Sequence, residues 1–122
     1  MEWSVEKLSS SLAETIARFE EEEMGVRPSR VTVVVEDDLV IVHLRDILSP
    51  SERALARTEA GQAMLQRFNT LLFNSGSSPS VMEQVAQVLK RQVVEVQTSL
   101  SSLSGSLVVV FSLGETPQSR QP

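Results

Sequence analysis

Apolar residues recur at two periods along the chain, and each period predicts one kind of element. Near the N-terminus they stand three or four residues apart, at Val5, Leu8, Leu12, Ile16 and Phe19. This spacing puts them on one face of a helix. We expect the helix to end near Gly25, because Pro28 prevents its resumption. For the acidic run at 20–23 we expect a solvated last turn, with a partner or cation site as the alternative.

Two β-branched runs follow, RVTVVVE at 30–36 and LVIVHLR at 39–45, on either side of the acidic pair Asp37-Asp38. Such runs around a short polar turn predict a β-hairpin. Apolar residues occupy both faces of the hairpin. It is therefore either covered on two sides or buries one face against a partner, and a homodimer is the simpler explanation.

Two capping boxes predict helix starts in the middle of the chain. Ser49 with Glu52 opens one helix, and Ser80 with Glu83 opens another. The segment at 58–61 contains Gly61 and interrupts the apolar pattern between them, which predicts either a kink or two short helices.

The last third returns to alternation. Val94, Val96, Thr98 and Leu100 alternate with polar residues, and a serine-rich turn leads into a strand over 107–113. We expect a single domain over 1–113 and a disordered polar tail over 114–122. The order α-β-β-α-α-β-β predicts an α+β fold, with a four-stranded sheet made from two β-hairpins and about three helices packed on one face.

Composition and charge exclude several functional classes. The 122 residues include no cysteine, which excludes disulfides and thiol catalysis. The net charge of −5 arises in the first 24 residues, which contain seven acidic residues and only two basic ones, Lys7 and Arg18. An acidic chain without a basic stripe is poorly suited to nucleic acid. No signal-like N-terminus and no apolar run of ~18–20 residues is present, so we expect a cytoplasmic protein without direct membrane insertion.

The candidate binding residues are His43, Arg45, Arg53 and Arg57. His43 is the only side chain whose ordinary pKa lies near neutrality. Arg53 and Arg57 lie one helical turn apart, where like charges repel, so the pair fits an anion or an acidic partner. Arg27 and Arg30, on nearby segments, could join them. The alternatives are that His43 is a surface or interface histidine, and that the arginines are scattered over a solvated surface or pair with the acidic first helix.

No catalytic residue, cofactor or metal site is predicted. The carboxylates Glu36, Asp37 and Asp38 lack the spaced oxygen ligands and the glycine of a calcium loop. The five glycines form no phosphate-binding loop, and no carboxylate or nucleophile stands at a recognisable spacing from His43.

Several of these residues form a pattern over about residues 5–113. Its most specific part is Leu48-Ser49-Pro50-x-Glu52-x-x-Leu55. The rest comprises Phe19, Gly25, Pro28, Val31, the segment Asp38-Leu39-Val40-Ile41-Val42-x-Leu44, Thr58, Gly61, Arg67, Val93, Val96, Gly105, Val108, Val110, Phe111 and Leu113. In this pattern the chain resembles the MpsC family of small bacterial domains. It departs from the family at Asp46, near which relatives usually carry a glycine before the Leu-Ser-Pro motif.

The resemblance implies a function without assigning any residue a role. MpsC-type proteins are associated with a membrane system for inorganic carbon uptake that is linked to cation movement. We therefore expect a non-enzymatic accessory or regulatory protein, dimeric through its apolar hairpin, that acts with a membrane transporter for bicarbonate, CO2 or cations. Two other hypotheses are a small-anion sensor at His43, Arg45, Arg53 and Arg57, and an enzyme that uses His43 as a base.

Overall fold

The computed structural model describes residues 5–75 and 80–114. The elements in these ranges are α1 (Val5–Met24), β1 (Arg30–Glu36), β2 (Leu39–Arg45), α2 (Pro50–Leu55), α3 (Glu59–Ser75), α4 (Val81–Leu89), β3 (Val93–Ser101) and β4 (Ser106–Leu113). Both predicted hairpins are present, as β1-β2 and β3-β4. Residues 115–122 of the predicted tail lie outside the described residues.

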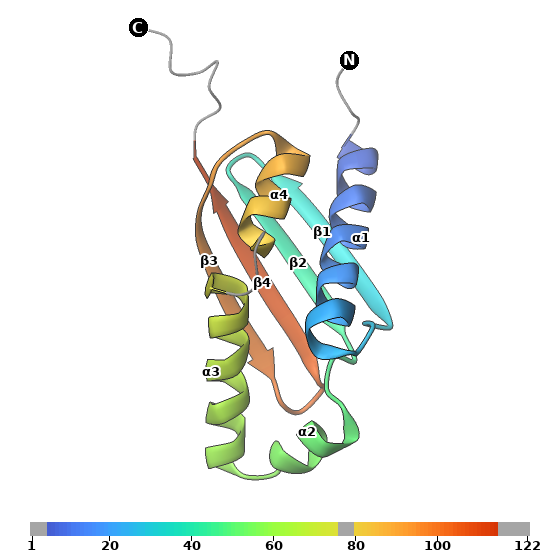
Figure 1. Ribbon diagram of the computed structural model, residues 1–122, viewed down its shortest axis with the longest axis vertical. Coiled ribbons are helices and arrows are strands. Elements are labelled where there is room, and N and C mark those ends of the chain that lie inside the picture. Colours follow the sequence, from blue (N-terminus) through green and yellow to red (C-terminus); the bar gives the residue numbers. More distant parts are fainter. Residues whose placement is uncertain (1–4, 76–79, 115–122) are drawn as a thin grey trace, which may run out of the picture.

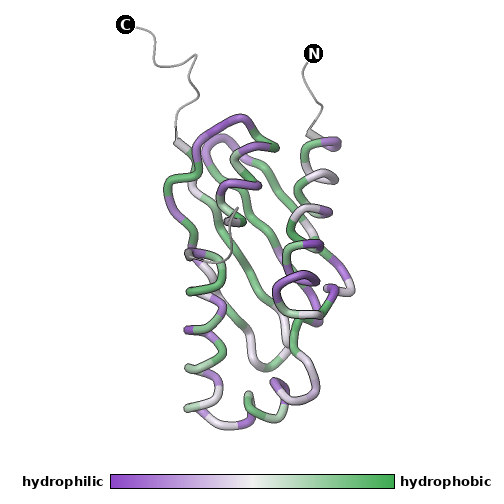
Figure 2. Tube along the Cα trace, viewed as in Figure 1, coloured by the Kyte–Doolittle hydropathy of each residue, from purple (hydrophilic) through white to green (hydrophobic). Residues whose placement is uncertain are grey.

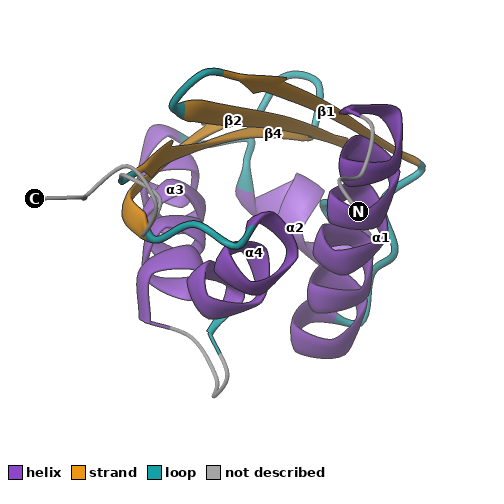
Figure 3. Cartoon of the chain, turned by 90° about the horizontal axis from the view of Figure 1, so that it is seen from above, coloured by secondary structure: helices purple, strands orange, loops and turns teal. Residues whose placement is uncertain are grey.

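The strands form one antiparallel sheet in the order β1-β2-β4-β3, so the two hairpins meet where β2 pairs with β4 (Figure 1). Seen from above, the sheet is one layer and the described helices all lie on one side of it (Figure 3). The predicted α+β fold, with its two-hairpin sheet and helices on one face, is confirmed.

The helical layer contains one helix more than predicted, because the chain breaks between α2 and α3. The side-chain oxygen of Thr58 accepts a hydrogen bond from the backbone nitrogen of Gly61 at 3.0 Å. A Cβ atom on Gly61 would lie 1.8 Å from the carbonyl oxygen of Leu55. The two helices can therefore approach this closely only with glycine at this position.

Both predicted capping boxes are confirmed. The Ser49 hydroxyl accepts from the Glu52 backbone nitrogen at 3.3 Å, and the Glu52 carboxylate accepts from the Ser49 backbone nitrogen at 2.9 Å. Ser80 and Glu83 make the same reciprocal pair at the start of α4, at 3.2 and 2.9 Å. Each box satisfies two backbone amides that the helix itself leaves without a partner.

The hydrophobic core lies between the sheet and the helices. Alternate residues of the two central strands are fully buried there, namely Val40, Val42, Leu44, Leu107, Val109 and Phe111. Helix α1 adds Leu12, Ile16 and Phe19 from the face that its spacing predicted. The ring of Phe19 meets Phe73 of α3 edge-on, with centroids 5.2 Å apart, so the first and third helices share one core.

The prediction for the start of β3 was wrong. Simple alternation placed Val94 on the same face as Val96, but Val94 is 55% exposed and Val93 is buried instead. The pairing with β4 shifts between Val93 and Glu95. Such a bulge reverses which side of the sheet the following residues face, and the sequence carries no signal for it.

Candidate functional site

The face of the sheet opposite the helices is partly apolar and is not covered by any described helix (Figure 3). Strand pairing arranges its side chains in rows across the sheet. The two central rows are Val34-Ile41-Val110-Gln97 and Thr32-His43-Val108-Ser99. Val34 and Ile41 are 47% and 37% exposed. We call this surface the open face.

Charges of opposite sign mark the two ends of the open face. Arg30 and Arg45 are directly paired across β1 and β2 at one end. At the other end the row contains Glu36 on β1 and Glu95 on β3. Within the described residues, no ion pair neutralises any of these four side chains. Like charges directly opposite each other on a sheet repel, so the arginine pair would gain from an acidic partner.

His43 lies in the middle of this face and is half-buried. Its direct neighbours across the sheet are Thr32 and Val108. Neither is a carboxylate that could orient the imidazole or share a proton with it. Arg45 lies two residues further along β2, on the same face.

The other two candidate residues lie elsewhere. Arg53 is on α2 and Arg57 follows that helix, and both are exposed. Among the described residues, no hydrogen bond or ion pair connects these arginines with each other or with His43 and Arg45. The structure therefore places two candidates on the open face and two on the segment that leads into the helical layer.

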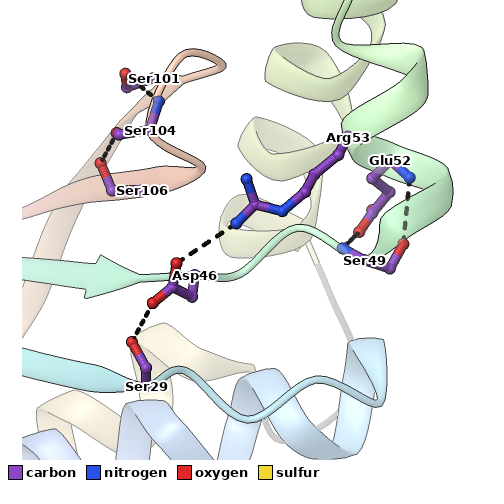
Figure 4. A network of polar contacts seen from close by, with 8 residues as sticks. All are labelled: Ser29, Asp46, Ser49, Glu52, Arg53, Ser101, Ser104 and Ser106. Atoms are coloured by element: carbon purple, nitrogen blue, oxygen red, sulfur yellow. Dashed lines mark hydrogen bonds and ion pairs between the residues drawn. The ribbon is translucent and has the colours of Figure 1, made fainter.

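Arg53 takes part in a polar network where β2 leads into α2 (Figure 4). Its guanidinium donates to Asp46 at 3.4 Å, and the other oxygen of Asp46 accepts from the Ser29 hydroxyl. A Cβ atom on Gly105, in the β3-β4 turn, would lie 3.0 Å from the same guanidinium. The two exposed contacts of Asp46 connect the segment before β1 with α2, and each is worth a fraction of a kcal/mol to about 1 kcal/mol.

Arg27 forms ion pairs with two carboxylates of the acidic first helix. Its guanidinium donates to Glu14 at 2.8 Å and to Glu21 at 3.1 Å. These two carboxylates raise the pKa of Arg27. The expectation that an arginine pairs with the acidic first helix is thus met at Arg27, which is not one of the four candidate residues.

Glu20 contradicts the prediction that residues 20–23 form a solvated turn. Its side chain is fully buried, and neither carboxyl oxygen has a hydrogen-bond partner among the described residues. The sequence did carry a signal, because Leu12, Ile16 and Glu20 are spaced by four and share one helix face. The acidic neighbours of Glu20 obscured this spacing.

Burial changes the acid-base behaviour of Glu20. Desolvation, with a smaller repulsion from Glu52, raises its pKa from 4.5 to about 7. The carboxyl is therefore about half protonated near neutral pH. This is an ionisable group within the helical layer that titrates in the physiological range, a property that an ordinary surface glutamate lacks.

Helix α3 presents a second apolar surface. Met64, Phe68 and Leu71 are 58%, 45% and 53% exposed. Their spacing of four and three residues puts them on one side of the helix, away from Leu65 and Phe73, which are buried. We call these three residues the α3 stripe. An exposed stripe of this kind is typical of a helix that contacts another molecule.

The described residues offer neither a metal site nor a membrane span. No group of three or more histidine, aspartate or glutamate side chains is placed to hold a metal ion. No helix in the same part of the chain has the length and apolar character to cross a membrane.

Comparison with known proteins gives the family. The family model described as "Na+-translocating membrane potential-generating system (MpsC)" matches residues 4–115. The chain belongs to the MpsC family. The resemblance drawn from the Leu48-to-Leu55 motif and the closing strands is thereby confirmed.

One curated relative is similar to this chain over nearly its whole length. The "Uncharacterized protein YbcI" of Bacillus subtilis (strain 168) is 26% identical over 113 residues, which cover 93% of this chain and 90% of the relative. No solved structure gave a significant match.

The backbone at Asp46 has the conformation that a glycine, expected near this position from the resemblance, would adopt. Asp46 has a φ of 57°, a left-handed conformation that favours glycine and that aspartate adopts more readily than most residues. A glycine before the Leu-Ser-Pro motif would therefore suit the same turn. The aspartate retains the turn and adds the contacts to Ser29 and Arg53.

Proposed function

We propose that this protein is a non-enzymatic accessory component of a membrane system that translocates Na+ and generates membrane potential. The observation that carries the proposal is the MpsC family match, which extends over nearly the whole chain. The fold supports it, because a small α+β domain with two separate apolar surfaces is suited to contacts with other proteins. A cytoplasmic location is part of the same proposal.

The α3 stripe is the surface that we propose contacts the membrane component. Its three side chains project from one helix, and helix-in-groove contacts use apolar anchors at this spacing. An exposed apolar stripe also contributes little to the stability of the isolated chain. It can therefore be altered without unfolding the protein.

The function is tested with cells that lack the protein. Na+-dependent membrane potential is measured with a potential-sensitive dye, in Na+ medium and in choline medium. We expect loss of the protein to lower the Na+-dependent part and the intact chain to restore it. An unchanged Na+-dependent potential would contradict the proposal.

The docking surface is tested by complementation in the same cells. The double variant Met64→Ser/Phe68→Ser should fail to restore the potential. Ala63→Ser is the matched control, because it places serine on the same exposed helix outside the stripe. Equal restoration by both variants would show that the stripe is not the contact surface. The tagged chain should also retain an integral membrane protein in mild detergent, and the double variant should lose it.

A small-anion sensor is the second candidate, and one observation favours it. Arg30 and Arg45 are paired across the sheet without an acidic partner among the described residues. The test compares the melting temperature of the protein in bicarbonate or phosphate with its melting temperature in chloride at equal ionic strength. A rise that disappears in Arg45→Ala but persists in Arg53→Ala would place the anion on the open face.

A further inference from the structure

The open face has a property that the proposed function does not use, since its charges are arranged so that two copies can complement each other. The apolar side chains Val34, Ile41, Val108 and Val110 lie in the centre. The arginine pair lies at one end of the strands, and Glu36 lies at the other end. A surface with opposite charges at its two ends can pair with a reversed copy of itself. This is the condition for a two-fold symmetric interface.

Two orientations of such a face-to-face pair keep the strands aligned. With the two-fold axis across the strands, each strand stacks on its own copy in the reverse direction. Glu36 then faces Arg30 and Arg45 of the second copy. With the axis parallel to the strands, β1 stacks on β3, and Glu36 faces Glu95 of the second copy. The charges favour the first orientation.

The apolar residues do not choose between the two orientations, so the charges decide. Reversal of the strands brings Val110 onto Val108 of the second copy and Ile41 onto His43. The other orientation would bring Ile41 onto Val110 and Val34 onto Gln97. Sheets that pack in this way lie about 10 Å apart, with strands turned by about 30°.

The size of the face fits an association of moderate strength. Four strands about 4.8 Å apart and seven residues long, at about 3.3 Å per residue, span roughly 19 by 23 Å. The accessible area of such a pleated surface lies somewhat below the ~800 Å² per partner of a standard interface. An interface of this size is typical of a weak, reversible association and not of an obligate dimer.

We propose that the open face is the interface of a two-fold symmetric homodimer, in which the sheets stack with reversed strands and Glu36 meets Arg30 and Arg45 of the second copy. The helical layers, with the α3 stripes, then lie on the outside of the dimer. This inference does not depend on the membrane function, and either can fail alone.

The first test uses charge reversal and sedimentation equilibrium of the full chain. Arg30→Glu/Arg45→Glu makes the arginine end of the face acidic, so that both ends are acidic. Glu36→Arg makes the opposite end of β1 basic, so that both ends of that strand are basic. Each variant alone should self-associate at least about tenfold more weakly than the unchanged chain. An equimolar mixture of the two should form heterodimers, because both end contacts are then between opposite charges. Arg57→Glu, off the face, is the matched control and should dimerise normally.

The second test separates the open face from the sheet edges. An antiparallel β1-to-β1 edge contact would also bring Arg30 near Glu36, but it would leave the interior strand β2 unused. Ile41→Ser on β2 should therefore weaken the proposed dimer about tenfold or more, whereas Met64→Ser on α3 should not. Circular dichroism checks that each variant is folded. A dimer that resists Ile41→Ser, a mixture that remains monomeric, or an unchanged chain that stays monomeric at millimolar concentration would each overturn the proposal.

Discussion

Val42 and Val109 are fully buried beneath the helices, whereas their neighbours along the strands, Ile41 and Val110, face the side that no described helix covers. Along the tube in Figure 2 the strands are hydrophobic at both kinds of position. Composition alone therefore does not separate the two faces. What separates them is their surroundings, because one face has charged residues at its ends and the other has helices against it. The inner face holds the fold together, and the open face is available for association.

The largest difference in stability should appear when the same substitution, leucine to alanine, is made once on each face of β2. Leu44 is fully buried and Leu39 is 40% exposed. Leu44→Ala should lower the free energy of unfolding by about 2–5 kcal/mol, because it leaves a cavity under the helices. Leu39→Ala should lower it by less than about 1 kcal/mol. Urea denaturation of dilute protein measures both, and equal losses would contradict the assignment of the two faces.

The next effect concerns the buried carboxyl of the helical layer. The pKa of Glu20 is about 7 in the folded protein and has its ordinary value of 4.5 in the unfolded chain. Between these two values the unfolded chain releases a proton that the folded protein retains. The free energy of unfolding should therefore fall as pH rises from 4.5 to 7, by roughly 3 kcal/mol for this group, and stay low above pH 7.

Glu20→Gln isolates this contribution. The variant should lose that part of the pH dependence and be the more stable protein at pH 8, because glutamine leaves no charge to bury. Glu36→Gln, on the open face, is the control and should keep the pH dependence of the unchanged chain. Urea denaturation at pH 5, 6, 7 and 8 gives the curves. Parallel curves for Glu20→Gln and the unchanged chain would mean that Glu20 titrates as a surface group.

A smaller effect is expected at the start of α2, where the helical layer joins the sheet. Ser49→Ala removes the hydroxyl that accepts from the Glu52 backbone nitrogen. A loss of about 1 kcal/mol is typical for such a cap. Ser51→Ala, at an exposed position on the same helix, should raise the free energy of unfolding by at most a few tenths of a kcal/mol, because alanine is the better helix former. If the two variants melt at the same temperature, the capping box does not stabilise this junction.

The smallest effect should be a gain in stability at the basic end of the open face. Arg45→Thr removes one of two like charges that are paired across the sheet. In dilute protein at low salt, this should raise the free energy of unfolding by a few tenths of a kcal/mol. Arg57→Thr should change nothing measurable. A clear loss of stability in Arg45→Thr would mean that Arg45 already has a favourable partner within its own chain.

The sequence was sufficient for most of the fold, because local patterns determine it. The helical spacing to Phe19, the two capping boxes and the turn at Asp37-Asp38 each depend on neighbouring residues. The break at Gly61 could be located but not resolved, since the choice between a kink and two helices depends on the distance to the Leu55 carbonyl oxygen. The bulge before Glu95 could not be predicted, because it is a property of the pairing with β4.

The candidate site was harder to predict, since it depends on which residues become neighbours in space. Arg45 and Arg53 are close in sequence, yet one is on the open face and the other is bonded to Asp46 at the junction with α2. The pairing of Arg30 with Arg45 follows from strand register alone, and the hairpin turn would have given it. The spacing of Glu20 from Ile16 could have predicted that Glu20 is buried. The run of acidic residues at 20–23 instead led to the prediction of a solvated turn.

The claim that the inner face folds the chain and the open face pairs two copies is tested most directly by methyl nuclear magnetic resonance during dilution. As the concentration falls, the methyl signals of Ile41, Val108 and Val110 should shift together along one binding curve. Those of Val42 and Val109 should move far less, and that of Met64 should not move. Shifts confined to Met64 and Leu71, or no shift at any concentration, would contradict the account.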